Sequence, residues 1–317
     1  MKNFALIGAS GYIAPRHMKA IKETNNNLLA SLDVSDSVGV IDSYFPDSYF
    51  FTEFERFDRH IEKLKYDDNV NIDYVSICSP NYLHDAHIRF ALRSGADSIC
   101  EKPLVLNPWN IDKLKKIEEK TGNKIYNILQ LRVHPSIISL KKKIDKQNKK
   151  TKYEVDLTYI TSRGNWYYNS WKGDESKSGG ISTNIGVHFF DMLTWLFGKI
   201  QINKVFVKEQ KLTSGYLEFE KARVRWFLST DSKYLPKSAL KKNQRTFRSI
   251  TINKKELEFS GGFTDLHTLV YKDILNGKGY GLNDVYQSIE IVHNIRNSKV
   301  ELSKGYENPF LKKIKNV

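Results

Sequence analysis

Apolar and polar residues follow two different patterns in the first part of the chain. Short apolar runs, typical of buried strands, occupy residues 3–8, 28–34, 74–78, 98–100 and 124–131. Between them, residues 13–22, 54–65, 81–93 and 108–120 carry apolar side chains at helical spacing, with Asn81 as a cap and Gly122 as a stop. Strands that alternate with such helices are typical of parallel βαβ units. The pattern predicts a doubly wound, Rossmann-like α/β domain over residues 1–130.

In the rest of the chain, strands succeed one another without helices between them. The predicted strands are residues 154–162, 200–208, 215–220, 222–229 and 248–259. A helix over 186–196 precedes most of them, and helices over 266–275 and 283–296 follow. The basic stretch 141–152 is expected to be a helix that runs into a polar link. This segregation predicts an α+β domain over residues 131–317 with an open, mainly antiparallel sheet.

Composition restricts the class of protein. Of the 317 residues 40% are hydrophobic, with 18 Gly and 8 Pro, so a sizeable core is available and global disorder is not expected. No uncharged apolar run approaches the roughly 20 residues that span a bilayer. The apolar N-terminal stretch is too short and too glycine-rich for a signal peptide. The two cysteines, Cys78 and Cys100, lie in apolar runs, so we expect a cytoplasmic protein with no disulfide framework and no metal site.

The chain is basic, with 50 Lys and Arg against 36 Asp and Glu and a formal net charge of +14. The lysines are spread over several solvated stretches, and no nucleic-acid recognition motif accompanies them. Nucleic-acid binding would predict an affinity that falls steeply with salt. An anionic small substrate accounts for the same charge, so we expect neither a nucleic-acid nor a membrane partner.

The first predicted strand leads directly into the glycine-rich segment GASGYIA, residues 8–14. Gly8, Gly11 and Ala14 are small where a dinucleotide fingerprint needs a sharp turn, close approach to a pyrophosphate and close helix–strand packing, with one extra residue in the spacing. Amides at the following helix N-terminus would face the phosphates. Asp33, at the end of the second predicted strand, would accept hydrogen bonds from ribose hydroxyls and repel a 2′-phosphate, which favours NAD over NADP. The alternative for Asp33 is a cap of the next turn.

Two polar motifs follow later strands of the same predicted sheet. Residues 79–84 read SPNYLH, and Glu101-Lys102-Pro103 follows the run 98–100. Both lie at carboxyl ends of strands, where open α/β sheets bind ligands. Lys102, held by the following proline, is a candidate to contact a reacting hydroxyl or carbonyl; the alternative is a lysine in an ordinary loop.

A third motif lies in the second half of the chain. Asn184 and His188 are four residues apart, so they would share one face of a helix. The preceding Gly179-Gly180 pair suggests close approach of a ligand. Because its neighbours are apolar, the alternative for His188 is a packed core residue.

Together these motifs resemble the glucose–fructose oxidoreductase and inositol dehydrogenase family over essentially the whole chain. The stretches DYVSICSPNYLH, ICEKPLV, YNILQLR and TNIGVHFFDML are most similar to its bacterial UDP-N-acetylglucosaminuronate 3-dehydrogenases. The resemblance implies NAD-dependent oxidation of the sugar C3 hydroxyl, for the synthesis of surface polysaccharides such as the O-antigen of lipopolysaccharide. It also implies a homo-oligomer, typically a tetramer, and in some members recycling of NADH by 2-oxoglutarate.

The resemblance also assigns roles to residues. Lys102 would orient the reacting hydroxyl and His188 would act as acid–base. Where the family commonly has Asp this chain has Asn184, a neutral amide that can position a hydroxyl but not take its proton. The residues implied in cofactor binding are Gly8, Ser10, Gly11, Tyr12, Ile13, Asp33, Ser79, Asn81, His84, Glu101, Lys102 and Gln130.

Anion clamps for the substrate are the remaining candidates. Arg132 and Arg163 each follow a predicted strand, and their planar guanidinium groups suit carboxylate and phosphate. Each is alternatively an ion-pair arginine. The aromatic run Trp166-Tyr167-Tyr168 either stacks on a uracil or sugar, or belongs to the core or a subunit interface. Rival functions are another sugar or cyclitol dehydrogenase of the family, and a non-catalytic sensor of NAD or sugar nucleotide.

Overall fold

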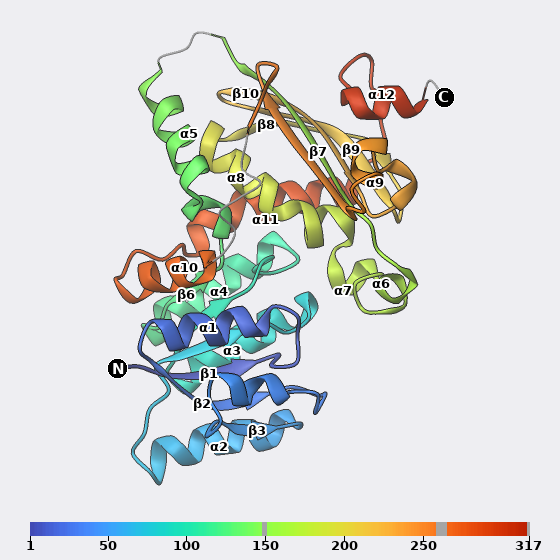
Figure 1. The fold of residues 1–317 in the computed structure, drawn as a ribbon. Coiled ribbons are helices and arrows are strands. Elements are labelled where there is room, and N and C mark those ends of the chain that lie inside the picture. Colours follow the sequence, from blue (N-terminus) through green and yellow to red (C-terminus); the bar gives the residue numbers. More distant parts are fainter. Residues whose placement is uncertain (148–150, 258–264, 316–317) are drawn as a thin grey trace. The chain divides into compact units, whose positions relative to one another are not determined.

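The computed structural model describes residues 1–147, 151–257 and 265–315, which form two compact units (Figure 1). Unit 1 comprises Met1–His134 and Gly262–Tyr286, and unit 2 comprises Pro135–Gly261 and Gln287–Val317. The first change of unit falls four residues after the predicted boundary at 130. The return of 262–286 to unit 1 has no counterpart in the predicted division, because periodicity identifies a helix but not the sheet on which it packs.

Unit 1 contains a six-stranded parallel sheet in the order β3-β2-β1-β4-β5-β6. Its strands are β1 (Asn3–Ile7), β2 (Asn27–Leu32), β3 (Tyr49–Phe51), β4 (Tyr74–Ile77), β5 (Asp97–Cys100) and β6 (Ile125–Asn127). This strand order is that of a doubly wound dinucleotide-binding fold, which confirms the predicted fold class. Strand β3 lies outside the predicted ranges, and β6 ends before a 3-10 turn over Gln130–Val133, so the predicted strand 124–131 is too long.

The helices of unit 1 largely match the predicted ranges. They are α1 (Ala14–Glu23), α2 (Phe54–Tyr66), α3 (His84–Ser94), α4 (Pro108–Thr121) and α10 (Leu266–Leu275). Gly122 ends α4 in the left-handed conformation, as predicted. Asn81 does not cap α3: it lies in a 3-10 turn over Asn81–Leu83, and the α-helix begins only at His84. Side chains of α1 and α10 share one hydrophobic cluster with β1, so α10 belongs to the core of this unit.

Unit 2 is built on a mixed sheet in the order β12-β11-β7-β10-β9-β8. Its strands are β7 (Tyr153–Thr161), β8 (Ile200–Lys208), β9 (Leu212–Phe219), β10 (Ala222–Ser229), β11 (Thr246–Ile252) and β12 (Lys255–Glu256). Among the described strands, only β7 and β10 pair in parallel, so the predicted mainly antiparallel sheet is confirmed. A turn splits the predicted strand 248–259 into β11 and β12, and its last two residues lie outside the described part of the chain.

Helices pack on both faces of the unit 2 sheet (Figure 1). The helices of unit 2 are α5 (Pro135–Lys146), α6 (Asn165–Asn169), α7 (Glu175–Ser178), α8 (Val187–Phe197), α9 (Lys237–Leu240) and α12 (Pro309–Lys315), and α11 (Leu282–Asn297) begins in unit 1 and continues into unit 2. Trp226 of β10 contacts Phe190 of α8 at 5.4 Å between ring centroids, and its neighbour Phe227 contacts Phe310 of α12 at 5.1 Å. Because successive strand residues point to opposite faces, α8 and α12 lie on opposite sides of the sheet. Among the described helices, none has the length and apolar content needed to cross a bilayer.

Candidate active site

The glycine-rich loop after β1 has the geometry of a dinucleotide turn. Gly8 has φ +94°, and a Cβ there would lie 2.6 Å from the carbonyl carbon of Cys78 at the end of β4. Ala14 begins α1 and is fully buried. Among the described residues, no acceptor takes the N–H groups of Tyr12 and Ile13, which immediately precede α1. A turn that only glycine tolerates and two unused amides at a helix N-terminus fit a pyrophosphate.

Asp33 follows β2 beside this loop. Its Oδ2 accepts from the Ser10 N–H at 2.9 Å, and its Oδ1 accepts from the Ser35 N–H at 2.9 Å. The contact with Ser10 joins the carboxylate to the glycine-rich loop. The contact with Ser35 is the turn cap that the sequence left as an alternative. Asp33 therefore caps its turn and also lies against the glycine-rich loop.

The SPNYLH motif folds around His84. The His84 Nδ1 lies 2.7 Å from the Pro103 carbonyl oxygen and its Nε2 lies 2.8 Å from the Ser79 carbonyl oxygen. Burial lowers the pKa of this imidazole, while the two carbonyls oppose the shift. Both ring nitrogens face backbone carbonyls, so His84 links the segments that follow β4 and β5. Its role in cofactor binding stays a prediction. The Ser79 hydroxyl contacts the Nδ1 of His87 at 2.8 Å, and Asn81 is buried in the adjoining turn.

Glu101 lies at the centre of a buried hydrogen-bonded network. Its Oε1 accepts from the Nε2 atoms of His17 on α1 and His267 on α10, at 3.1 and 2.8 Å. The His17 Nδ1 contacts the Tyr271 hydroxyl at 2.7 Å, and that hydroxyl contacts the Ser76 hydroxyl at 2.6 Å. Burial alone would raise the pKa of the Glu101 carboxyl, but the hydrogen bonds from the two histidines hold it well below its usual range.

The proton positions in this network follow from the ionised carboxylate. A carboxylate only accepts, so His17 and His267 must both carry a proton on Nε2. Burial lowers the pKa of His17, so its ring is neutral and its Nδ1 accepts from the Tyr271 hydroxyl. Tyr271 then accepts from Ser76. The donor and the acceptor of each hydrogen bond in the series Ser76–Tyr271–His17–Glu101 are therefore assigned. The Glu101 side chain is held in one orientation.

This network fixes the main chain beside Lys102. The Glu101 Oε2 accepts from the Lys102 N–H at 3.2 Å, and Asn127 Nδ2 donates to the carbonyls of Cys100 and Glu101 at 2.7 and 3.2 Å. The Lys102–Pro103 peptide is cis, and the Lys102 side chain is half-buried. Lys102 is thus carried on a segment held from both sides. Glu101 directs both carboxylate oxygens into the protein and so positions Lys102. Its contact with a cofactor stays a prediction.

His17, Glu101 and His267 also present a donor set that zinc accepts, with ligating atoms all within 4.8 Å of one another. Both imidazole nitrogens, however, lie at hydrogen-bond distance from the same carboxylate oxygen. The hydrogen bonds account for the cluster, and we assign no metal to it.

Arg132 and Gln130 lie in the 3-10 turn after β6. The Arg132 guanidinium is buried, donates to the Asp284 carboxylate and carbonyl at 3.2 and 2.9 Å, and lies 4.8 Å from the centroid of the Tyr280 ring. The ion pair that the sequence left as the alternative is thus present, between two segments of unit 1, and the role of Arg132 as an anion clamp stays a prediction. Gln130 is half-buried at the start of the turn, at the carboxyl edge of the sheet that also carries Gly8, Asp33 and Lys102.

Asn184 and His188 lie in one helical path in unit 2. Asn184 belongs to a π-helical turn over Ser182–Gly186, and His188 is the second residue of α8. The wider π turn replaces the regular helix assumed in the sequence, and such turns are frequent at functional sites. Both side chains are half-buried, so His188 is not the fully packed core residue of the alternative interpretation. Asn184 Nδ2 donates to the Tyr167 hydroxyl at 2.8 Å.

The Gly179-Gly180 pair has a structural explanation. Both residues have φ values in the left-handed region, and a Cβ on Gly179 would lie 2.6 Å from the Thr183 Cβ. The pair ends α7 and turns the chain into the π-helical segment, so the ligand approach that it suggested is not needed to explain it.

Arg163 follows β7 and is exposed. Its guanidinium carbon lies 5.8 Å from the centroid of the Tyr167 ring, and its N–H donates to the Thr230 carbonyl at 3.0 Å. Tyr167 is buried, Tyr168 is half-buried and Trp166 is exposed, so the aromatic run does not act as one surface.

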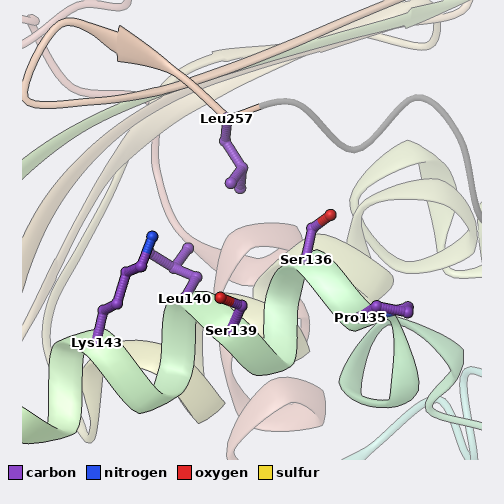
Figure 2. Close-up of a pocket in the computed structure, with 6 residues that line it drawn as sticks. All are labelled: Pro135, Ser136, Ser139, Leu140, Lys143 and Leu257. Atoms are coloured by element: carbon purple, nitrogen blue, oxygen red, sulfur yellow. The ribbon is translucent and has the colours of Figure 1, made fainter.

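A separate pocket of about 430 Å³ lies on α5 (Figure 2). Leu257 points toward the helix from the far side, and the other lining residues are Pro135, Ser136, Ser139, Leu140 and Lys143. No predicted site residue lines it.

The sequence analysis did not single out His17, Asn127, His267 or Tyr271. Each is a polar residue on the buried face of its element. His17 and His267 lie at positions that the helical pattern assigns to the core, where an ionisable side chain signals a buried partner. That signal identifies the residues but not the carboxylate they share.

Comparison with known proteins identifies the family. The sequence profile of the GFO_IDH_MocA oxidoreductase family, NAD-binding Rossmann fold, matches residues 2–128, and the profile of its C-terminal alpha/beta domain matches residues 141–238. The chain belongs to this oxidoreductase family. Curated relatives match only in part: inositol 2-dehydrogenase of Rhizobium meliloti is 32% identical over 41% of this chain, and the match spans 38% of that relative's own length.

Solved structures match over the full length. The WlbA (WbpB) dehydrogenase from Thermus thermophilus, crystallised with NAD and alpha-ketoglutarate, is 49% identical, with a TM-score of 0.94 over 98% of this chain and 100% of that chain. The same enzyme with NAD and UDP-GlcNAcA aligns at 48% identity. The WlbA dehydrogenase from Bordetella pertussis, at 18% identity and a TM-score of 0.75 over 93% of this chain and 94% of that chain, shares the fold.

Proposed function

We propose that the protein oxidises the C3 hydroxyl of UDP-N-acetylglucosaminuronate, transferring hydride to NAD and producing the 3-keto sugar. The observation that carries the proposal is the full-length match to a dehydrogenase whose structure contains NAD and UDP-GlcNAcA. The position of oxidation rests on the motif resemblance.

NAD fits the residues of unit 1. Gly8 and Gly11 give the backbone approach, and the free amides of Tyr12 and Ile13 are available to the pyrophosphate. The Asp33 carboxylate, beside the loop, suits ribose hydroxyls and disfavours a 2′-phosphate. When bound, NAD accepts the hydride. Ser79, Asn81 and Gln130 are proposed to line the same carboxyl edge of the sheet.

Lys102 and His188 carry the proton chemistry in this proposal. Lys102 hydrogen-bonds the C3 hydroxyl and stabilises negative charge that develops on its oxygen. His188 takes the hydroxyl proton, a task that an imidazole performs near neutral pH. Asn184 positions the sugar through its amide. Arg163 contributes positive charge for the anionic substrate, and the same role for Arg132 stays a prediction, since Asp284 pairs with its guanidinium.

Three further features belong to the same proposal. Recycling of NADH by 2-oxoglutarate is supported by the alpha-ketoglutarate in the Thermus thermophilus enzyme. A cytosolic location is supported by two unpaired cysteines, whose thiol pKa values are raised by burial. A homotetramer follows from the resemblance alone, and light scattering on the purified protein tests it.

The test is NADH formation at 340 nm, near the absorbance maximum of NADH, across UDP-sugars, free sugars and inositols, with and without 2-oxoglutarate. We expect turnover with UDP-N-acetylglucosaminuronate and little with UDP-N-acetylglucosamine, whose sugar lacks the carboxylate. Losing an ionic clamp on a carboxylate costs about 30-fold or more in efficiency. Equal efficiency with the two sugars would contradict the substrate assignment, and turnover with inositol alone would favour a cyclitol dehydrogenase.

Variants test the two proton-handling residues. Lys102→Ala and His188→Asn should each lower kcat by about 10²–10⁴ while NAD affinity changes little. Their combined loss should be smaller than the product of the single losses, because groups that act together are not additive. Asn184→Ala should cost less. A folded, NAD-binding His188→Asn protein with near-native kcat would show that His188 takes no part in the mechanism. A non-catalytic sensor would keep its ligand binding in both Lys102→Ala and His188→Asn.

A further inference from the structure

Two cations of unit 2 lie beside neighbouring aromatic rings, Tyr167 at 5.8 Å and Trp166 at 5.7 Å, whose centroids are 5.8 Å apart. The cations are Arg163, after β7, and Lys172, in the turn between α6 and α7. No carboxylate in the described ranges forms a salt bridge with either, whereas Lys152, Arg225 and Lys233 of this unit each pair with one. Burial, and secondly the nearby Arg163 guanidinium, lowers the pKa of Lys172. Two neighbouring like charges, of which Lys172 is partly desolvated, favour an anion beside them.

Lys172 is held in place by the turn that carries it. The Gly173 N–H donates to the Ser170 carbonyl at 3.0 Å, and a Cβ on Gly173 would lie 2.2 Å from the Tyr168 carbonyl oxygen. Only glycine permits this close approach of turn and helix. The Tyr168 hydroxyl in turn donates to Thr230 Oγ1 at 2.8 Å, after the end of β10. The main chain that carries Lys172 is therefore an anchored turn and not a loosely held surface loop.

The same Thr230 anchors the second cation. Its carbonyl accepts from the main-chain N–H of Arg163 at 3.0 Å, so the segments that carry both cations are joined to the end of β10. The Arg163 guanidinium lies beside the Tyr167 ring, whose hydroxyl accepts from Asn184 at 2.8 Å. One tyrosine thus separates the cation from the asparagine proposed to hold the reacting sugar. An anion bound by Arg163 and Lys172 would belong to a neighbouring part of the same substrate.

Trp166 completes the cluster. Its side chain is 59% exposed, although the Lys172 ammonium lies 5.7 Å from its ring centroid and 4.4 Å from that of Trp171. An exposed indole beside two cations provides a flat apolar surface for a planar ring. Tyr167 and Tyr168 use their hydroxyls within the protein, so Trp166 is the member of the aromatic run that is available to a ligand.

We propose that Arg163 and Lys172 bind the diphosphate of a sugar nucleotide and that Trp166 stacks on its base. The assignment deepens the proposed function and rests on it for the identity of the sugar. A uronate carboxylate carries one charge, which a single arginine fork accommodates. A diphosphate carries more charge on several oxygens and is attached to a planar base. Two cations with an adjacent indole match the second group.

Calorimetric titration with UDP tests the subsite without NAD or turnover. Lys172→Met and Arg163→Met should each weaken UDP binding about ten- to hundredfold, the loss expected for one charged hydrogen bond. Trp166→Ala should weaken it about fivefold or more. The matched control is Lys233→Met: Lys233 also lies over an aromatic ring, Tyr234 at 4.8 Å, but is paired with Asp231 at 3.5 Å. It should leave UDP affinity unchanged.

Free glucuronate distinguishes the two anionic groups. If the cations serve the carboxylate, glucuronate competes with substrate in the native protein more strongly than in Lys172→Met, and UDP binding is insensitive to the change. That result, or absence of UDP binding to the native protein, would overturn the proposal. Melting curves of each variant verify folding, and Lys172→Gln provides a second substitution if Lys172→Met does not fold.

The outcome is separable from that of the proposed function. If UDP binding depends on Lys172 but UDP-N-acetylglucosaminuronate is not oxidised, the UDP subsite is supported and the proposed reaction is contradicted. Normal oxidation with an unchanged KM for the UDP-sugar in both Lys172→Met and Arg163→Met would leave the reaction standing and remove the subsite.

Discussion

Replacing Glu101 by Gln tests whether the buried carboxylate holds the main chain at Lys102. In the native protein the carboxylate accepts hydrogen bonds from His17, His267 and the Lys102 N–H, at 3.1, 2.8 and 3.2 Å. An amide has one oxygen and one NH₂ group, so it cannot accept at both positions. With its oxygen toward the two imidazoles, its NH₂ group faces the Lys102 N–H, and one bond is lost.

The magnitude follows from these three bonds. A buried N–H left without an acceptor costs ~1–3 kcal/mol, and two charge-assisted bonds that become neutral lose roughly 1 kcal/mol each. Removal of a buried charge relieves its desolvation and offsets part of this cost. We expect a net loss of about 2–4 kcal/mol in the free energy of unfolding. For a chain of this size, that lowers Tm by roughly 3–6 °C.

The network also makes stability depend on pH. The pKa of His17 is lowered from 6.5 by burial, and that of Glu101 is held well below 4.5 by its histidine donors despite burial. Both groups take up protons more readily in the unfolded chain, so acid favours unfolding. The His17 contribution is present above pH 6.5 and is lost as pH falls through its lowered pKa. The Glu101 contribution is lost only as pH falls below 4.5.

Thermal melts at several pH values, with kcat measured on the same samples, check the prediction. Glu101→Gln should melt lower at neutral pH, should lack the part of the acid-induced loss that belongs to Glu101, and should have a lower kcat because the support of Lys102 is weakened. The control is Glu53→Gln, an exposed carboxylate of the same unit paired only with Arg56 at 3.7 Å, which should change stability by less than about 0.5 kcal/mol. A Glu101→Gln protein with native Tm, pH dependence and kcat would refute the reasoning.

Two further predictions concern the cofactor loop. Asp33→Ala should narrow the preference for NAD over NADP, because it removes the charge opposite a 2′-phosphate; calorimetry checks this, and equal NADP binding by the native protein would contradict it. Gly8→Ala and Gly122→Ala both place a side chain at positive φ, +94° and +77°, which costs ~1–2 kcal/mol. Only at Gly8 does the new Cβ meet Cys78, at 2.6 Å, so denaturant unfolding should find Gly8→Ala clearly the less stable of the two.

Much of the fold was predictable because its signals are local. The alternation of strands and helices in the first part, and the run of strands in the second, correctly predict both sheets. Strand β3 was beyond reach, since three residues carry too little periodicity, and the predicted strand 124–131 was too long because a 3-10 turn continues its apolar run. The π-helical turn at Asn184 has no signature in residue spacing.

The candidate site divides in the same way. Glycine-rich turns, strand-end motifs and the acidic residue after β2 are determined by backbone geometry over a few residues, so the sequence by itself identifies Gly8, Asp33 and Lys102 as candidates. What it cannot determine is which distant groups satisfy a buried charge. Glu101 is bound by histidines 84 and 166 residues away, and Arg132 by an aspartate 152 residues away. Only the tertiary structure decides such pairings, because a buried charge needs a partner in space, and helix packing brings that partner from any part of the chain.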